Sequence, residues 1–235
     1  MTKENVLFVI IGLLAGLIIG FVFANSVNQK GAMPVAADMK LNSNMPPDHP
    51  DIGATGGTGG QGVITPEIQA AMDKAKQAPD DFDAQVSAAD MYYQIRRYDD
   101  AIGLLKQANK LKPDDRDVLV QLGNANFDAE KYSEAEKSYI AALAKKADDV
   151  NVRTDLGLTF VFRDPPNYDR AIQEFNKSLE TDSNHIQTLQ NLTVAYTKKG
   201  EAAKANATLA KLEGIDPKNS AIAKLREDIQ KNANK

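Results

Sequence analysis

The chain has 235 residues, of which 43% are hydrophobic and 26% charged, with a net charge of −4 and a pI near 5.3. This length suits one sizeable domain with appendages, and the acidic balance provides no basic field that would attract a nucleic-acid backbone. The absence of cysteine excludes disulfides, thiolate zinc sites, cysteine nucleophiles and the acylated cysteine of a bacterial lipoprotein.

The first feature along the chain is a long apolar segment. After a short tail at 1–5, residues 6–24 (VLFVIIGLLAGLIIGFVFA) are apolar or glycine and carry no charge. A helix of this length spans roughly 28 Å, close to the thickness of a bilayer core, and predicts one transmembrane helix. The competing interpretation is a cleaved signal peptide, because residues 22–24 (VFA) have a spacing that a signal peptidase accepts. The apolar run is, however, longer than the usual signal core of about 7–15 residues.

The charges that flank this segment determine its orientation poorly, since Lys3 on one side faces Lys30 and Lys40 on the other. We expect the tail to stay in the cytoplasm, which makes the chain a single-pass protein of a bacterial inner membrane with its remaining residues outside the cytoplasm. Small residues recur every four positions along one side of the helix at Gly12, Gly16 and Gly20. A second helix could approach there, so a homodimer through the anchor is one interpretation.

Residues 25–64 predict a disordered linker, because they are rich in glycine, proline and asparagine and show no apolar periodicity. A flexible chain of this length has a root-mean-square reach of roughly 35 Å. The linker contains residues whose sulfur and imidazole atoms suit copper: Met33, Met39, Met45 and His49. A metal-handling role is therefore an alternative, but scattered methionines in such a segment are more often accidental, and we predict no metal site and no cofactor.

Residues 65–78 predict a short helix that caps the N-terminal end of a helical domain. Thr65 supplies a capping oxygen, and Pro66 fits the first helical position. One apolar stripe at helical spacing comes next in this segment: Ile68, Ala71, Met72 and Ala75.

From Phe82 the sequence repeats with a period of 34 residues. The stretches AIGLLKQANKLKPDD (101–115) and AEKSYIAALAKKADD (135–149) keep their alanines, large apolar residues and closing acidic pair in step. Four units share the pattern: 82–115, 116–149, 150–185 and 186–219. The third unit is two residues longer because of RDPPN (163–167), an insertion between its helices that leaves both helices in register.

Several series of residues keep the same phase in all four units. One series pairs Ala101, Ala135, Ala171 and Ala205 with large residues four positions later, at Leu105, Tyr139, Phe175 and Leu209. Another begins with Ala88-Ala89, Leu122-Gly123, Leu156-Gly157 and Leu192-Thr193. This pattern over residues 82–219 resembles the tetratricopeptide repeat. Asn126, where an aromatic is usual, and Ala147 and Ser183, where proline is usual, depart from it.

The resemblance implies an all-α fold, a right-handed α-solenoid of about four helix-turn-helix repeats with capping helices. Small residues such as Gly123 and Gly157 would let the two helices of a unit approach closely. No unit buries its apolar face alone, so the units must stack. Residues 220–235 predict the terminal capping helix, with Ser220 as its N-cap.

In proteins of this family the first helices of the units line a concave groove that receives a peptide or a partner helix. The resemblance places twelve residues in that groove: Val86, Asp90, Tyr93, Val120, Asn124, Phe127, Thr154, Leu158, Val161, Gln190, Val194 and Thr197. We assign Tyr92 to the core, because it cannot point inward together with Tyr93. Val86 and Asp90 stand where a carboxylate clamp for a heat-shock-protein tail would have lysine and asparagine, so an extended segment or amphipathic helix with apolar anchors fits better.

These features favour a membrane-anchored scaffold that binds protein partners and is not an enzyme. The sequence has no paired carboxylates at a constrained site, no phosphate-binding glycine loop joined to a strand and no activated nucleophile, so we assign no catalytic residue. A second hypothesis is an envelope assembly factor or chaperone, resembling anchored repeat proteins of cytochrome c maturation or of secretion.

Overall fold

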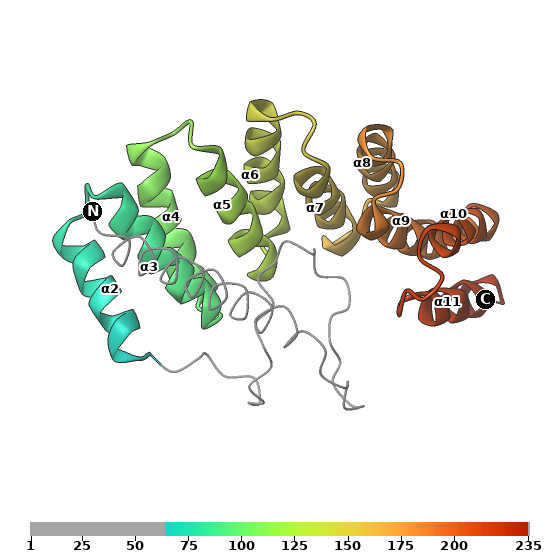
Figure 1. The fold of residues 1–235 in the computed structure, drawn as a ribbon, viewed down its shortest axis with the longest axis horizontal. Coiled ribbons are helices and arrows are strands. Elements are labelled where there is room, and N and C mark those ends of the chain that lie inside the picture. Colours follow the sequence, from blue (N-terminus) through green and yellow to red (C-terminus); the bar gives the residue numbers. More distant parts are fainter. Residues whose placement is uncertain (1–63, 235) are drawn as a thin grey trace, which may run out of the picture. The chain divides into compact units, whose positions relative to one another are not determined.

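The structure, a computed structural model, describes residues 64–234 (Figure 1). The predicted transmembrane helix 6–24, its glycines Gly12, Gly16 and Gly20, and nearly all of the predicted linker lie outside the described residues. None of the helices in 64–234 combines the length and the apolarity needed to cross a membrane.

The described residues form an all-α array of ten helices joined by short turns. The helices are α2 (Pro66–Gln77), α3 (Phe82–Gln94), α4 (Tyr98–Leu111), α5 (Arg116–Asp128), α6 (Tyr132–Lys145), α7 (Val150–Phe162), α8 (Tyr168–Thr181), α9 (Ile186–Lys199), α10 (Ala202–Ile215) and α11 (Ile222–Ala233). Each packs chiefly on the helix before it and the helix after it, so the helices stack in pairs (Figure 1). We call α3, α5, α7 and α9 the first helices of the four units, and α4, α6, α8 and α10 the second helices.

The closing acidic pairs of the sequence repeat have a structural role at the start of the first helices. Asp81, Asp115 and Asp149 are N-caps, and the carboxylate of each accepts a hydrogen bond from a backbone N–H three residues later, at 3.0–3.1 Å. Such a bond satisfies an amide that the helix itself leaves without a partner. His185 takes this position in the fourth unit, where its Nδ1 accepts from the backbone N–H of Thr188 at 3.4 Å.

The turn between the two helices of a unit has the same form in the first, second and fourth units, and it is longer in the third unit. Arg96, Glu130 and Gly200 occupy equivalent positions with φ of 60°, 58° and 85°, the left-handed region. In the second unit the N–H of Lys131 then bonds the carbonyl of Asn126, five residues earlier, at 2.8 Å. In the third unit the N–H of Asn167 makes the corresponding bond to Phe160 across seven residues, at 2.7 Å. The predicted insertion is thus accommodated entirely within the turn.

Glycine allows the two helices of the second and third units to approach closely. A Cβ built on Gly123 would lie 2.3 Å from the ring of Tyr139, and one built on Gly157 would lie 2.4 Å from the ring of Phe175. Both rings are fully buried. These contacts confirm the predicted role of the two glycines, and they explain why large aromatic residues occupy the facing positions.

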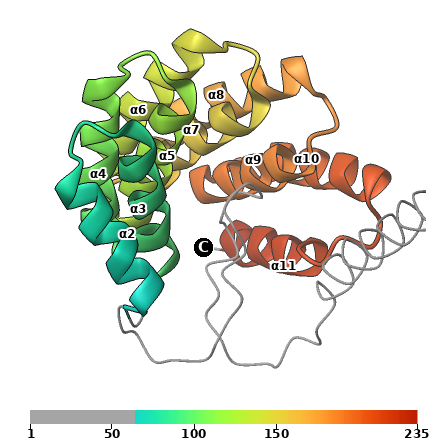
Figure 2. The ribbon, with the colours of Figure 1, turned by 60° about the vertical axis from the view of Figure 1, so that its left-hand side comes forward.

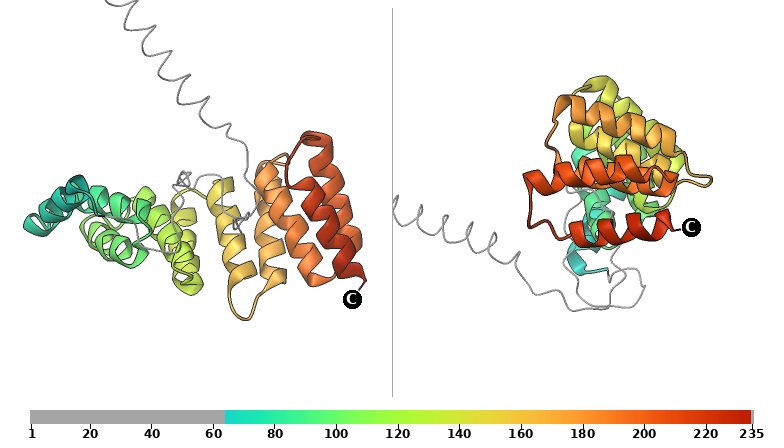
Figure 3. Two further views of the ribbon diagram at one scale, coloured as in Figure 1. Left: turned by 90° about the horizontal axis from the view of Figure 1, so that it is seen from below. Right: turned by 90° about the vertical axis from the view of Figure 1, so that its right-hand side faces the viewer.

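Helices α2 and α11 cover the two ends of the array. The side chain of Gln85 in α3 donates to the carbonyl of Ala75 in α2 at 2.7 Å, and Thr65 caps α2. At the other end, α11 packs beside α9 and α10 (Figure 3). Ser220 is not the N-cap of α11 as expected, because that helix begins at Ile222. The side chain of Asn219 instead accepts from the backbone N–H of residue 221 at 3.0 Å.

Candidate protein-binding face and aromatic pocket

The residues predicted to line a groove come from four helices that follow one another in space (Figure 2). Gln121 of α5 donates a hydrogen bond to Asp90 of α3 at 3.0 Å. The hydroxyls of Thr154 in α7 and Thr188 in α9 lie 2.6 Å apart. The ring of Phe162 in α7 lies 5.7 Å from the ring of Phe127 in α5. The first helices therefore contact one another in succession, and we call the accessible side chains that they share on this side the first-helix face.

Eight of the twelve predicted residues remain accessible on this face. Asp90 is exposed, and the other seven are half-buried: Val86, Tyr93, Val120, Asn124, Val161, Gln190 and Val194. Tyr92 is only 6% exposed, which confirms its assignment to the core. Valines from all four first helices are among the accessible residues, so the face combines apolar side chains with amides, a phenol and a carboxylate.

The structure corrects the prediction at four positions, where the side chain is buried. Phe127 is 6%, Thr154 1%, Leu158 2% and Thr197 7% exposed. A partner does not reach side chains buried to this extent, so these residues stabilise the array and do not form its surface.

Neighbouring helices account for the burial. Phe127 is covered by the rings of Tyr132 and Phe162, and Thr154 by the adjacent helix α9. Leu158 belongs to a run of α7 that is buried without interruption from Thr154 to Phe160. Next to Thr197, the side chain of Asn232 in α11 donates to its backbone carbonyl.

Acidic and phenolic groups lie close together in the first three units, some on the first-helix face and others, such as Tyr139 of α6, buried beneath it. The hydroxyl of Tyr93 donates to Asp128, and the hydroxyl of Tyr139 donates to Asn124 at 2.9 Å. Burial, followed by the charge of Asp128, raises the pKa of Tyr93 well above its usual range. Burial and the nearby charges of Asp155 and Asp128 raise the pKa of Tyr139 in the same direction. Each carboxylate therefore lies close enough to these phenols to act on them electrostatically.

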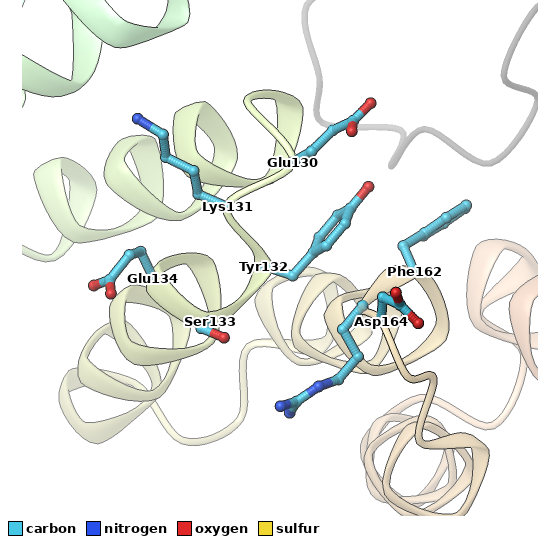
Figure 4. A pocket seen from close by; sticks show the side chains of 8 residues that line it. Glu130, Lys131, Tyr132, Ser133, Glu134, Phe162 and Asp164 are labelled. Atoms are coloured by element: carbon cyan, nitrogen blue, oxygen red, sulfur yellow. The ribbon is translucent and has the colours of Figure 1, made fainter.

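A pocket of about 520 Å³ lies where the turn of the second unit meets the turn of the third. Its lining is Glu130, Lys131, Tyr132, Ser133, Glu134, Phe162, Arg163 and Asp164 (Figure 4). We call it the aromatic pocket, because the rings of Tyr132 and Phe162 stack at 6.2 Å between centroids and 23° between planes. Both rings also pack edge-on against the buried ring of Phe127.

The charged groups of the aromatic pocket fall into two sets. Lys131 bonds Asp99 of α4, Arg163 pairs with Glu136 at 3.4 Å, and Glu134 pairs with Lys137 at 2.8 Å. Figure 4 shows the carboxylate of Glu130 on the hydroxyl side of Tyr132, and Asp164 lines the pocket two residues after Phe162. Burial, then the charges of Glu130 and Asp128, raises the pKa of Tyr132.

The aromatic pocket could not be predicted from the sequence. Tyr132 belongs to a phased series with Tyr98 and Tyr168, and Phe162 immediately precedes the insertion. Both signals were visible, but nothing in the sequence places the two rings together. Within residues 64–234, no three histidine or acidic residues are grouped so that they could hold a metal ion. The candidate copper ligands Met33, Met39, Met45 and His49 lie outside the described residues.

Solved structures share this fold at low sequence identity. The crystal structure of MamA is 24% identical with a TM-score of 0.59, and the match covers 64% of this chain and 87% of MamA. A thermophilic TPR protein of Thermus thermophilus, TTC0263, is 17% identical with a TM-score of 0.52, over 64% of this chain and 87% of that one. YrrB, described as a TPR protein with an unusual peptide-binding site, is 14% identical with a TM-score of 0.52, over 71% and 94%.

Comparison of the sequence with protein families identifies the repeat directly. No curated protein matches the chain. One tetratricopeptide repeat profile matches residues 96–156 and 167–229, and a second profile with the same description matches 67–116. The first match skips nearly all of the insertion of the third unit and still covers more than half of the chain. The chain belongs to the tetratricopeptide repeat family.

Proposed function

We propose that this protein is a non-enzymatic scaffold that binds a segment of a protein partner along the first-helix face. The observation that carries the proposal is that four successive first helices contact one another and that each has accessible side chains at the predicted positions. The fold similarity to YrrB, which is described as having a peptide-binding site, supports a peptide as the kind of ligand.

The chemistry of the face indicates which segment would bind. Val86, Val120, Val161 and Val194 are half-buried and offer apolar contacts at intervals along the face. Asn124 and Gln190 can exchange hydrogen bonds with a peptide backbone. An extended segment or an amphipathic helix with several apolar anchors would use both kinds of contact.

The proposal includes an anchor and a location. Residues 6–24 would hold the protein in a bacterial inner membrane with the repeats outside the cytoplasm, and the basis for this is the uninterrupted apolar run. An assembly or chaperone role in the envelope would follow from that orientation. Protease treatment of spheroplasts tests it: digestion of the repeats is expected, and repeats that resist until the membrane is lysed would refute the orientation.

Crosslinking in cells tests the binding face. A photoreactive residue replaces Val120 on α5 in the full chain, and the matched control replaces Ile140, a 47% exposed apolar residue on the second helix α6. We expect a specific partner to be captured from position 120 and not from position 140. Asp90→Arg, an exposed charge reversal, should reduce that capture about tenfold or more without changing the helical content. Equal capture from both positions would refute binding on the first-helix face.

A further inference from the structure

The aromatic pocket has a chemical character that differs from the first-helix face beside it. The face offers separate valines and amides, whereas the pocket places two stacked aromatic rings next to carboxylates. The two surfaces adjoin along α7, because the accessible Val161 of the first-helix face directly precedes Phe162 of the pocket. A segment bound on the first-helix face can therefore extend a side chain into the pocket.

The rings make the pocket suitable for a cation. Tyr132 and Phe162 are half-buried, so each keeps part of its ring surface accessible. The π-face of an aromatic ring is negative and attracts an ammonium or guanidinium group. The two rings stack on each other, which leaves the outer ring surface for a ligand.

The charges of the pocket reinforce this preference. Its two basic residues are held by carboxylates that are not part of the lining, Lys131 by Asp99 and Arg163 by Glu136. Figure 4 shows Lys131 directed away from the rings, while Glu130 and Asp164 line the pocket together with them. Glu130 is close enough to act on the Tyr132 ring, since burial first and then the charge of Glu130 raise the pKa of Tyr132.

We propose that the aromatic pocket binds an arginine side chain carried by the partner segment that occupies the first-helix face. A guanidinium is flat, so it stacks on a ring while its N–H groups bond carboxylates at its edge. Lysine would satisfy the charge but not the stacking. This inference rests on the proposed function, because the arginine belongs to a bound protein segment.

The residues at the end of the third unit's first helix and in the turn after it distinguish this junction from the others. Asp164 and Arg163 belong to the two-residue-longer turn, and Phe162 is the last residue of α7 before it. The equivalent residues before the turns of the other units are polar: Gln94, Asp128 and Lys198. This junction therefore combines a second ring, which the other units lack at that position, with a carboxylate of the longer turn.

A peptide selection with a matched pair of ligands tests the proposal. The full chain in detergent micelles is used to select from a library of random twelve-residue peptides, and the best binder is synthesised twice, with arginine and with citrulline. Citrulline has the shape of arginine without its charge. We expect the selected peptides to share an arginine, and the change to citrulline to raise Kd about tenfold.

Variants then locate the effect in the pocket. In Glu130→Gln/Asp164→Asn the two peptides should differ in Kd by less than about twofold, because the carboxylates that recognise the cation are gone. Asp148→Asn/Glu180→Gln removes two exposed carboxylates elsewhere and should keep the tenfold difference. Circular dichroism checks that both double variants keep their helices.

Three results would overturn the proposal, and they separate it from the proposed function. If citrulline binds as well as arginine, while Asp90→Arg abolishes binding of both peptides, the first-helix face binds peptides and the pocket has no part in recognition. If the arginine preference survives in Glu130→Gln/Asp164→Asn, the cation is recognised elsewhere. If no peptide is selected above background, both proposals fail.

Discussion

Replacing Gly123 by alanine should destabilise the second unit, although alanine is favoured over glycine in helices. A Cβ at this position would lie 2.3, 2.5 and 2.9 Å from three ring atoms of Tyr139, whereas carbon atoms normally approach to about 3.5–4.0 Å. The ring cannot turn away easily, because it is fully buried and its hydroxyl bonds Asn124 at 2.9 Å.

The magnitude follows from two opposing terms. Alanine gains about 1 kcal/mol over glycine in a helix interior. Overpacking a dense core costs about 1–3 kcal/mol, and a clash with three ring atoms belongs at the upper end of that range. We therefore expect a net loss of about 2 kcal/mol. Urea unfolding followed by circular dichroism measures it as a lower midpoint.

Gly103→Ala is the matched control, since Gly103 is exposed in α4 and nothing lies within 4 Å of a Cβ built there. It should stabilise the protein by about 0.5–1 kcal/mol. The first unit suggests a rescue, because it has Ala89 and Leu105 where the second has Gly123 and Tyr139. In Gly123→Ala/Tyr139→Leu the two changes should compensate by about 1 kcal/mol or more relative to their sum. A Gly123→Ala protein as stable as Gly103→Ala would refute the packing argument.

Three further predictions concern charged and phenolic groups. Folding raises the pKa of Tyr93 and Tyr139, so their contribution to stability is fully present below the ordinary tyrosine pKa of about 10 and is lost as the pH rises above it. In an alkaline titration, the phenolate absorbance of these two tyrosines should therefore appear together with the loss of helical signal. Ionisation of Tyr93 and Tyr139 near the ordinary pKa, with the helices intact, would refute this. Asp149→Asn keeps the N-cap but loses the ion pair with Arg116, and should lower the free energy of unfolding in urea by about 1 kcal/mol or less. Asp149→Ala loses both interactions and should lower it by about 2 kcal/mol. Glu174 is 2% exposed and faces three cationic side chains. Glu174→Leu should therefore lower the free energy of unfolding by about 3 kcal/mol. A loss below about 1 kcal/mol would show that those cations find other partners.

The repeat and its boundaries could be read from the sequence because many positions agree in phase. The closing acidic pairs at 114–115 and 148–149 recur in the same phase of the repeat, because one aspartate of each pair caps the first helix of the next unit. The insertion at 163–167 was located because the alanine and aromatic series shift by two residues across it. Such information is local, and a sequence displays it directly.

The accessibility of the first-helix face could not be read in the same way. Thr154 and Leu158 have the spacing of an exposed face, but neighbouring helices cover them, and α7 is buried along most of its length. Similarly, Tyr132 of α6 and Phe162 of α7 line one pocket only because their two helices pack together across the boundary between the second and third units. Both outcomes depend on how one unit packs on the next, which no single unit's sequence encodes.

The contacts between units have a mechanical consequence. Lys131 bonds Asp99, Lys145 bonds Asp114 and Lys199 bonds Asp169, and each of these pairs joins only neighbouring units. None of these three ion pairs joins one end of the array to the other. A pulling force would therefore detach units one at a time from the ends. Each released unit of 34 residues would lengthen the chain by roughly 115 Å, and the third unit by about 7 Å more. The same protein could therefore yield gradually under tension instead of breaking at one threshold.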